Sequence, residues 1–517
     1  MTVETTAQHE LLIQSLMDPL RWPEGGADRR RIDTHISTVI LAGDVAYKLK
    51  KPLDLGFLDY FTIDSRHRAC IEELRVNSRL APQIYQGVSA ITGSIERPQV
   101  DGQGKPIDWA VRMRRFDPDA ILSKQMDRLN PRLIRLLADR VARFHQDTDL
   151  CDPAEAYGSA DSIYAPMTQN LKQIGTRAPQ FSADIESLQA WSATQRQQLD
   201  AVLQRRKESG HIRECHGDLH LGNVALVEGE PVMFDAIEFN PGLRWIDTIS
   251  DIAFMTMDLQ ERGRNDLAYR FLDRYLQSAG DYDGLTVLRF YEVYRALVRA
   301  KIAAIRCAQV DLSELERDTV LVELTGYIAF AKQLTGLRRG AIVITQGVSG
   351  SGKSHVSEKL PDFLPAVRLR SDIERKRLLG LDPHDDATSQ GAYSAELTRL
   401  TYERLRSLAN RVAAAGYVAV VDATFLKRAQ RDMFGSLARS LRVPFLIIDC
   451  DAPVELLRER IIARREKAGN VSDADLHVLD SQLAAREILT DTEQAVRTII
   501  RPGEPLDREE IAERLRG

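Results

Sequence analysis

The eight residues at 347–354, GVSGSGKS, have the types and the spacing that hold the phosphates of a nucleotide. They fit the pattern G-x-x-x-x-G-K-[ST], in which the backbone N–H groups of a glycine-rich loop surround the phosphates. The lysine of this pattern reaches the β- and γ-phosphates, and the final hydroxyl binds Mg²⁺. The segment therefore predicts a site for ATP or GTP with Mg²⁺. The residues expected there are Gly347, Ser349, Gly350, Ser351, Gly352, Lys353 and Ser354.

A second segment, HGDLHLGN at 216–223, places two histidines, an aspartate and an asparagine within eight residues. A loop has little structural reason to gather these side chains, so the pattern indicates a functional site. The segment is similar to the catalytic loop of protein-kinase-like enzymes, where an aspartate takes the proton of the acceptor and an asparagine holds Mg²⁺. On this similarity Asp218 is the predicted catalytic residue and Asn223 a metal ligand.

Phosphoryl transfer from ATP depends mainly on positioning and charge, so only a few further groups are needed. Residues 45–48, VAYK, end a predicted strand and match the lysine motif V-A-I-K, so Lys48 is expected to bind ATP. Glu73, on the following predicted helix, is its expected partner, with Glu72 as the alternative. Asp235 opens the segment DAIEF after a predicted hairpin strand and is the expected second metal ligand.

Further polar residues follow the predicted strands of the second half. Asp372 lies nineteen residues after Lys353, where an aspartate of a small P-loop kinase can contact the acceptor hydroxyl and act as a base. Arg375 would hold an anionic part of the substrate through paired hydrogen bonds. Asp422 ends a strand and would lie close to Mg²⁺, with Thr424 as a substrate contact. A lid over the transferring phosphate is expected from Arg460, Arg464 and Arg465.

The elements that must position these residues change in type near residue 338. Up to about 335, strand patterns such as 36–50 and 109–116 are mixed with mostly helical stretches. Beyond that point apolar strands alternate with helices, which predicts a parallel α/β sheet. The strands are expected at 341–346, 366–370, 417–422 and 444–449.

We therefore predict two domains. The first is a bilobal α+β protein-kinase-like domain at 1–335, with lobes at about 1–115 and 116–335. The second is an α/β P-loop NTPase domain with a parallel sheet at 336–517. A chain of 517 residues is long enough for several hydrophobic cores.

The composition of the chain limits the partners and the cellular compartment that we expect. The net charge of −5 argues against nucleic acid, which stays open only at the P-loop half. Five scattered cysteines argue against a zinc site or disulfides and favour a reducing compartment. No signal peptide pattern and no apolar run of about 18 residues is present, so we expect a cytoplasmic protein without a membrane span. The sequence does not indicate an oligomeric state.

The first half resembles the aminoglycoside phosphotransferase and choline kinase family. The resemblance rests on HGDLHLGN, on the downstream Asp235 and on DTISDIAF at 247–254. It implies that Val111 and Met113 lie on the strand beside adenine, and that Asp251 buttresses the catalytic loop.

The second half resembles the polynucleotide kinase, gluconate kinase and zeta-toxin group of P-loop kinases. The residues that carry this resemblance are the loop at 347–354, S-D-x-x-R at 371–375 and D-A-T at 422–424. The whole chain resembles bacterial proteins described as bifunctional aminoglycoside phosphotransferase/ATP-binding proteins, whose second half is often named an AAA family ATPase.

These patterns predict an ATP- and Mg²⁺-dependent phosphotransferase with two sites, each acting on a hydroxyl of a small molecule. Two alternatives stay open: the P-loop half is a nucleotide-gated regulator, or it is an RNA or nucleotide-end kinase with the first half as its recognition module. Neither acceptor can be named. A basic cluster, Arg295, Arg299 and Lys301, would suit an anionic acceptor. A polycationic aminoglycoside would need acidic residues, for which the candidates are Glu238, Asp247 and Asp258.

Overall fold

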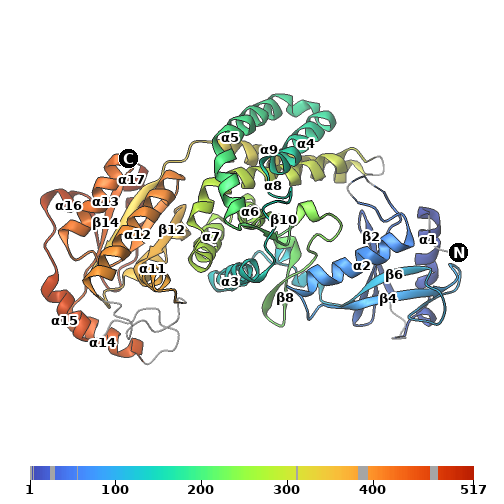
Figure 1. The fold of residues 1–517 in the computed structure, drawn as a ribbon, viewed down its shortest axis with the longest axis horizontal. Helices are drawn as coiled ribbons and strands as arrows, with labels where there is room; N and C mark the ends of the chain where they lie inside the picture. The colour runs from blue at the N-terminus through green and yellow to red at the C-terminus, as the bar shows by residue number, and fades with distance from the viewer. Residues whose placement is uncertain are drawn as a thin grey trace. The chain divides into compact units, whose positions relative to one another are not determined.

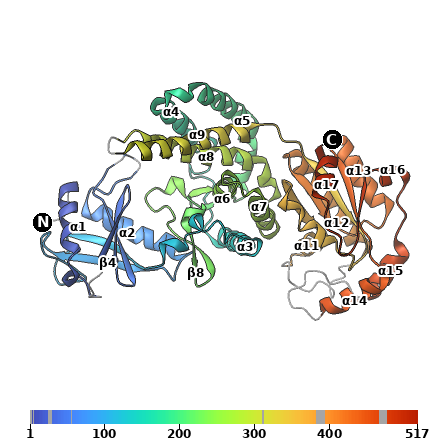
Figure 2. The same ribbon diagram turned by 180° about the vertical axis from the view of Figure 1, so that it is seen from behind.

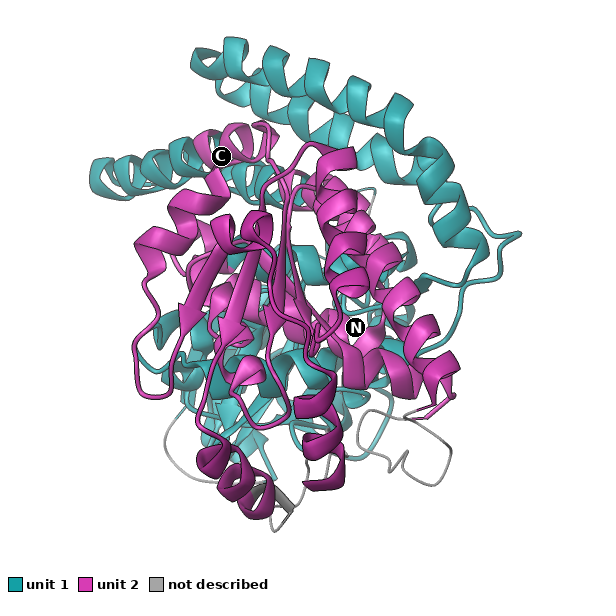
Figure 3. Ribbon diagram, turned by 90° about the vertical axis from the view of Figure 1, so that its left-hand side faces the viewer, with its two compact units in different colours: residues 1–258, 294–328 teal, residues 259–293, 329–517 magenta. Residues whose placement is uncertain are grey.

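The computed structural model describes residues 3, 5–23, 29–54, 56, 58–309, 312–381, 394–465 and 476–516. The chain divides into two compact units (Figure 3). Unit 1 comprises residues 1–258 and 294–328, and unit 2 comprises residues 259–293 and 329–517. Within the described ranges, no helix has the length and apolar character needed to cross a membrane. The domain boundary expected at 335/336 stays a prediction.

Unit 1 starts with a six-stranded antiparallel sheet in the order β1-β2-β3-β6-β4-β5. Its strands are β1 (Arg29–Asp33), β2 (Ser37–Ala42), β3 (Val45–Lys50), β4 (Tyr85–Gly93), β5 (Pro98–Val100) and β6 (Asp108–Arg114). β2 and β3 form the hairpin predicted at 36–50, because β-branched and apolar residues alternate around a tight glycine turn. Two helices accompany the sheet, α1 (Thr6–Leu16) and α2 (Ile63–Ser78). Thr62 caps the N-terminus of α2 in a capping box with Ser65.

The rest of unit 1 is mostly helical. Its helices are α3 (Pro131–Asp147), α4 (Ala160–Arg177), α5 (Ser182–Glu208) and parts of α6 (Thr248–Glu261), α8 (Leu285–Cys307) and α9 (Glu314–Thr335). Two short antiparallel pairs frame the HGDLHLGN loop: β7 (Ile212–Glu214) with β10 (Trp245–Asp247), and β8 (Val224–Val227) with β9 (Glu230–Met233). The loop therefore leaves one strand pair and enters the next, which holds both of its ends.

Unit 2 contains a five-stranded parallel sheet in the order β12-β13-β11-β14-β15. Its strands are β11 (Ala341–Gln346), β12 (Ala366–Arg370), β13 (Val418–Asp422), β14 (Phe445–Cys450) and β15 (Arg497–Ile500). The first four occur where the sequence predicts strands, and the predicted parallel α/β architecture is confirmed. The central strand β11 is buried at every position, because helices cover both faces of the sheet (Figures 1 and 2).

The helices of unit 2 come from two stretches of the chain. The first stretch supplies α7 (Asn265–Ala279) and the beginning of α8. The second supplies α10 (Lys353–Ser357), α11 (Ser371–Leu378), α12 (Ala395–Ala414), α13 (Arg428–Leu441), α14 (Val454–Arg465), α15 (Leu476–Ala485), α16 (Asp491–Ala495) and α17 (Arg508–Arg516). One core cluster joins α10 and α17 to the sheet through Val343, Val356 and Ile511.

Candidate active sites

Lys48, the predicted ATP-binding lysine of unit 1, makes two ion pairs. Its Nζ lies 2.8 Å from Glu73 Oε1 and 2.6 Å from Asp235 Oδ1, although these partners are 25 and 187 residues away in sequence. Burial opposes the charge on Lys48, but the carboxylates of Asp235 and Glu73 outweigh it and raise its pKa well above the ordinary value. The structure thus joins three of the predicted residues and keeps the lysine cationic, as phosphate binding requires.

Asp235 has a backbone conformation that is unusual for a residue other than glycine. Its φ of 62° lies in the left-handed region, and its N–H donates to the hydroxyl of Tyr85 over 3.2 Å. Its side chain is 46% exposed, so one face of the carboxylate stays open to solvent beside Lys48. Strained backbone of this kind concentrates at functional sites, where the surrounding fold maintains it.

Asp218 and Asn223, the predicted catalytic residue and metal ligand, contact each other directly. Asn223 Nδ2 donates to Asp218 Oδ2 over 2.8 Å, and His220 Nε2 lies 3.4 Å from the same oxygen. Burial opposes ionisation of Asp218, but His220 favours the carboxylate and holds its pKa below the usual range. Such a carboxylate is a weak base, so it suits orientation of a hydroxyl in a reaction whose transition state is loose.

Buried residues beneath the HGDLHLGN loop hold its backbone. Asp251 accepts the N–H of His216 over 3.0 Å and that of Gly217 over 2.9 Å. Arg295 donates to the carbonyl of Gly217 over 2.9 Å and is 5% exposed. His216 bonds through its ring to the carbonyl of Phe234, the residue before Asp235. Arg295, one member of the predicted basic cluster, is therefore part of the scaffold of the loop.

Three side chains of types that can bind a metal ion also lie together beneath this loop: His145, Cys215 and Asp251. One ligand-type atom of each lies within 4.8 Å of the others. Both oxygens of Asp251 already accept backbone N–H groups, so this buried group supports the loop and does not suit a metal ion. The oxygens of Asn223 and Asp235 are instead the kind of ligand that Mg²⁺ takes in proteins.

Lys50 was not predicted at the first site, and Glu238 was named only as an acidic residue that would suit a polycation. Lys50 lies two residues after Lys48, so both point to the same face of β3. It is fully buried and donates to Glu73 Oε2 and to Glu238 Oε1. The hydroxyl of Tyr60 donates to Glu238 Oε1 over 2.6 Å. Glu73 thus bridges two lysines, and the K-x-K alternation on a strand was the signal that could have revealed this.

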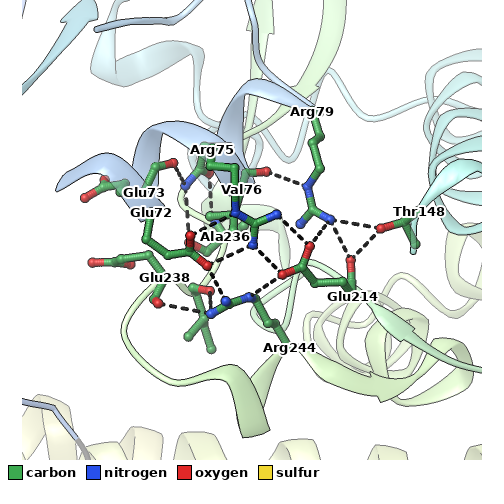
Figure 4. Close-up of polar contacts among 12 residues, drawn as sticks. Glu72, Glu73, Arg75, Val76, Arg79, Thr148, Glu214, Ala236, Glu238 and Arg244 are labelled. Atoms are coloured by element: carbon green, nitrogen blue, oxygen red, sulfur yellow. Dashed lines mark hydrogen bonds and ion pairs between the residues drawn. The ribbon is translucent and has the colours of Figure 1, made fainter. Parts of the chain in front are cut away.

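Glu72, the alternative partner for Lys48, belongs to a separate group of charges that we call the arginine network (Figure 4). Arg75 of α2 donates to Glu72 over 2.8 Å and to Glu214 over 2.5 Å. Arg79 of α2 donates to Glu214 over 2.8 Å. Arg244 donates to Glu214 over 2.9 Å and also bonds Glu72. Since Glu214 ends the strand before the HGDLHLGN loop, the network ties α2, which carries Glu73, to that loop.

Glu214 predicts a pH dependence of stability. Burial opposes its ionisation, but hydrogen bonds from Arg75 and Arg244 outweigh it and lower its pKa from 4.5 to about 2. The stabilisation is therefore present above pH 4.5 and is lost as the pH falls towards 2. We expect Glu214→Gln to lower the free energy of unfolding by about 3 kcal/mol at pH 7, with a smaller difference at pH 3.

Urea unfolding followed by tryptophan fluorescence measures this effect in unit 1 alone. All four tryptophans lie within residues 1–258, at Trp22, Trp109, Trp191 and Trp245. Glu230→Gln is the matched control, because Glu230 forms an exposed pair with Arg140. A difference between wild type and Glu214→Gln that is the same at pH 7 and pH 3 would contradict the assignment.

Val111 and Met113, implied to lie beside adenine, are on β6 opposite Lys48 and Ala46 of β3. Val111 is fully buried in a core cluster, and Met113 packs against the same cluster. Their contact with adenine stays a prediction.

The nucleotide loop and the predicted acceptor residues of unit 2 line one cavity of about 310 Å³. The strands are parallel, so their carboxyl ends meet at one edge of the sheet. There β11 runs into the loop, β12 ends at Arg370 and β13 ends at Asp422. The predicted residues in the lining are Ser349, Gly350, Gly352, Lys353, Ser354, Asp372, Arg375, Asp422 and Thr424.

The glycines of the loop are required by its backbone. Gly347, Gly350 and Gly352 have φ values of 142°, 85° and 102°. A Cβ atom on Gly347 would lie 2.6 Å from the carbonyl oxygen of Cys450. A tight loop without side chains at these positions presents its N–H groups to phosphate. The hydroxyl of Ser354 and the carboxylate of Asp422 are oxygen donors that suit Mg²⁺.

Helices α14 and α15 add further groups near the loop. Arg460 of α14 donates to the carbonyl of Gly350 over 3.1 Å, and with Ser351 it lines a second cavity of about 310 Å³. The side chains of Arg464 and Arg465 lie outside the described residues, so their part in a lid stays a prediction. Gln482 of α15 was not predicted; its Oε1 accepts the N–H of Ser349 over 2.7 Å.

Two family models match the chain. Residues 62–291 match the phosphotransferase enzyme family, and residues 342–489 match an AAA domain. The chain is a phosphotransferase. In this phosphotransferase the HGDLHLGN loop lies in the first matched range and the GVSGSGKS loop in the second. Both family matches imply the use of a nucleotide.

The phosphotransferase is also similar to other proteins, either over most of its length or over one of its two halves. Uncharacterised proteins of Mycobacterium tuberculosis and Mycobacterium bovis are 29% identical over 476 residues, which is 90% of this chain and 91% of theirs. An ethanolamine kinase structure from Plasmodium vivax is 12% identical, with 58% of this chain and 81% of that chain covered and a TM-score of 0.37. An APS kinase structure from Mycobacterium tuberculosis is 20% identical, with 35% and 100% covered and a TM-score of 0.27.

Proposed function

We propose that this phosphotransferase has two ATP sites, each of which transfers the γ-phosphoryl group to a hydroxyl of a small molecule. One observation supports this most directly: each unit gathers a set of phosphoryl-transfer residues from distant parts of the chain. In unit 1 Lys48 meets Glu73 and Asp235. In unit 2 the loop meets Asp372 and Asp422 in one cavity.

At the first site Lys48 would bind the phosphate oxygens of ATP, and the oxygens of Asn223 and Asp235 would hold Mg²⁺. The oxygen of the acceptor hydroxyl attacks the γ-phosphorus, and the bond to the bridging oxygen of ADP breaks. The hydroxyl proton passes to a carboxylate oxygen of Asp218. The open face of Asp218, 36% exposed, is where the acceptor would lie.

At the second site the loop and Lys353 would bind the phosphates, with Ser354 and Asp422 on Mg²⁺. Asp372 would take the proton of the acceptor hydroxyl. Arg375 Nη1 lies 3.4 Å from Asp372 Oδ1, so the arginine can orient this carboxylate and bind an anionic part of the acceptor. Thr424 lines the same cavity as a further acceptor contact.

The first acceptor is not expected to be a polycation. Each of the three acidic candidates already has a structural partner. Glu238 pairs with Lys50, Asp247 bonds Arg206 through both oxygens, and Asp258 accepts the N–H of Leu221. Binding of an aminoglycoside at Glu238 or Asp247 would require their ion pairs with Lys50 and Arg206 to separate.

The test is transfer of labelled γ-phosphate from ATP into a metabolite extract by wild type, Asp218→Asn, Lys353→Ala and the double variant. We expect each single variant to lose a different set of labelled products, by about 100-fold or more, and the double variant to lose both. Acceptor-dependent transfer in the double variant would exclude our assignment of the sites. Loss of every product in one single variant would instead favour a regulatory nucleotide site. Labelling of added 5′-hydroxyl oligonucleotides that Lys353→Ala removes would favour the end-kinase alternative.

A further inference from the structure

We propose that Asp273 of α7 is a positioning residue for the acceptor side of the second site, an inference that rests on the proposed function of Asp372. Helix α7 lies within the stretch that matches the phosphotransferase family, at 62–291. In the structure this helix belongs to unit 2, where it packs along strand β12. A helix from one matched region thus supports the active site of the other.

Helix α7 makes three contacts with β12 and the residues on either side of it, through Arg270, Asp273 and Gln277. Arg270, Asp273 and Gln277 are spaced by three and four residues, which places them on the same side of a helix. Arg270 pairs with Asp362, just before β12. The carbonyl of Gln277 accepts from Arg377 of α11 over 2.8 Å, near the end of α7 where carbonyls lack helical partners. Asp273 lies between these two contacts.

Asp273 makes a buried pair with Arg368, the middle residue of β12. One carboxylate oxygen accepts the backbone N–H of Arg368 and the other accepts its Nε, each over 2.8 Å. The two residues are 2% and 8% exposed. β12 is an edge strand, so its outward N–H groups have no neighbouring strand. Asp273 supplies the missing acceptor and neutralises the guanidinium at the same point.

The segment that α7 holds is the one that carries the acceptor residues. β12 ends at Arg370, and α11 follows at once with Asp372 and Arg375. The nucleotide loop instead follows β11, which is held between β13 and β14. Loss of the Asp273 pair should therefore disturb the acceptor side of the cavity and leave the nucleotide side in place.

The experiment uses the full chain with Asp218→Asn, so that ATP hydrolysis to ADP and phosphate reports on the second site. We expect Asp273→Asn to lower kcat about tenfold, because an unpaired buried guanidinium remains, while KM for Mg·ATP changes less than about twofold. Hydrogen exchange should become faster in residues 366–378 and stay the same in 341–346. Asp266→Asn is the control on the same helix, since Asp266 forms only a half-exposed pair with Arg264, away from β12, and should change neither quantity.

A second substitution separates this role from a general loss of structure. Adding Arg368→Gln to Asp273→Asn removes both charges, so kcat should recover to within about threefold of the parent. Equal acceleration of exchange throughout unit 2, or unchanged kcat and exchange in Asp273→Asn, would overturn the proposal. Asp372→Asn tests the proposed function independently: if it leaves hydrolysis unchanged, the role of Asp372 fails, whatever Asp273 does.

Discussion

Replacing Lys50 by alanine is expected to lower the free energy of unfolding of unit 1 by about 3–5 kcal/mol and to stop turnover at the first site. Lys50 is fully buried between Glu73 and Glu238. Burial opposes its charge, but these carboxylates raise its pKa well above the ordinary value, so it is a cation at neutral pH. Without it the buried Glu238 loses its ion pair and keeps the hydrogen bond from the hydroxyl of Tyr60, and Glu73 loses one of its two lysines.

The effect on activity follows from the geometry of Glu73. Its two oxygens hold Lys48 and Lys50 separately, so loss of one cation allows the carboxylate to rotate away from the other. Tryptophan fluorescence during urea unfolding gives the stability, and ATP turnover in the Lys353→Ala background gives the activity. Lys51→Ala is the control: Lys51 is partly exposed, bonds the carbonyl of Thr34 and should contribute less than about 1 kcal/mol. Equal effects of the two substitutions would contradict the role of Lys50.

Replacing Gly347 by alanine is expected to remove nucleotide binding at the second site. The new Cβ would lie 2.5 Å from Ser351 Oγ and 2.6 Å from the carbonyl oxygen of Cys450, which is backbone and cannot turn away. The φ of 142° is also one that side chains disfavour. Steric overlap and backbone strain together would destabilise this loop conformation by about 2–5 kcal/mol. The loop must therefore move, and its N–H groups would no longer point towards the phosphates. Affinity for Mg·ATP there should fall about 30-fold or more.

Calorimetric titration with Mg·ATP measures this change as the loss of one of two sites. Gly435→Ala is the matched control within unit 2. Its Cβ would make only ordinary contacts, the nearest at 3.6 Å from Arg439, and alanine favours the interior of helix α13. We therefore expect two sites in this control. Two sites of unchanged affinity in Gly347→Ala would show that the loop does not bind the nucleotide.

The sequence predicted the elements whose signal is local. Strands β11 to β14 were recognisable as apolar runs that alternate with helices, and β2 and β3 as a hairpin. The short strands β7 and β15 were missed, because three or four residues carry too little periodicity to be recognised. Two partners of the first site, Lys50 and Glu238, were missed as a pair for another reason. A charged residue has the same local pattern whether it is solvated or buried, and both Lys50 on β3 and Glu238 in the loop after β9 are buried.

The sequence by itself determined the two phosphate motifs. The residues of GVSGSGKS lie within one loop, as do those of HGDLHLGN, so their spacing in the sequence sets their arrangement in space. Only the tertiary structure decided which distant charges meet. Lys50 and Glu238 are 188 residues apart, and Asp273 and Arg368 are 95 residues apart. Such pairs depend on which elements pack together, and packing is a property of whole apolar faces. It is this packing that distinguishes a buried Lys50 from a partly exposed Lys51 one residue later.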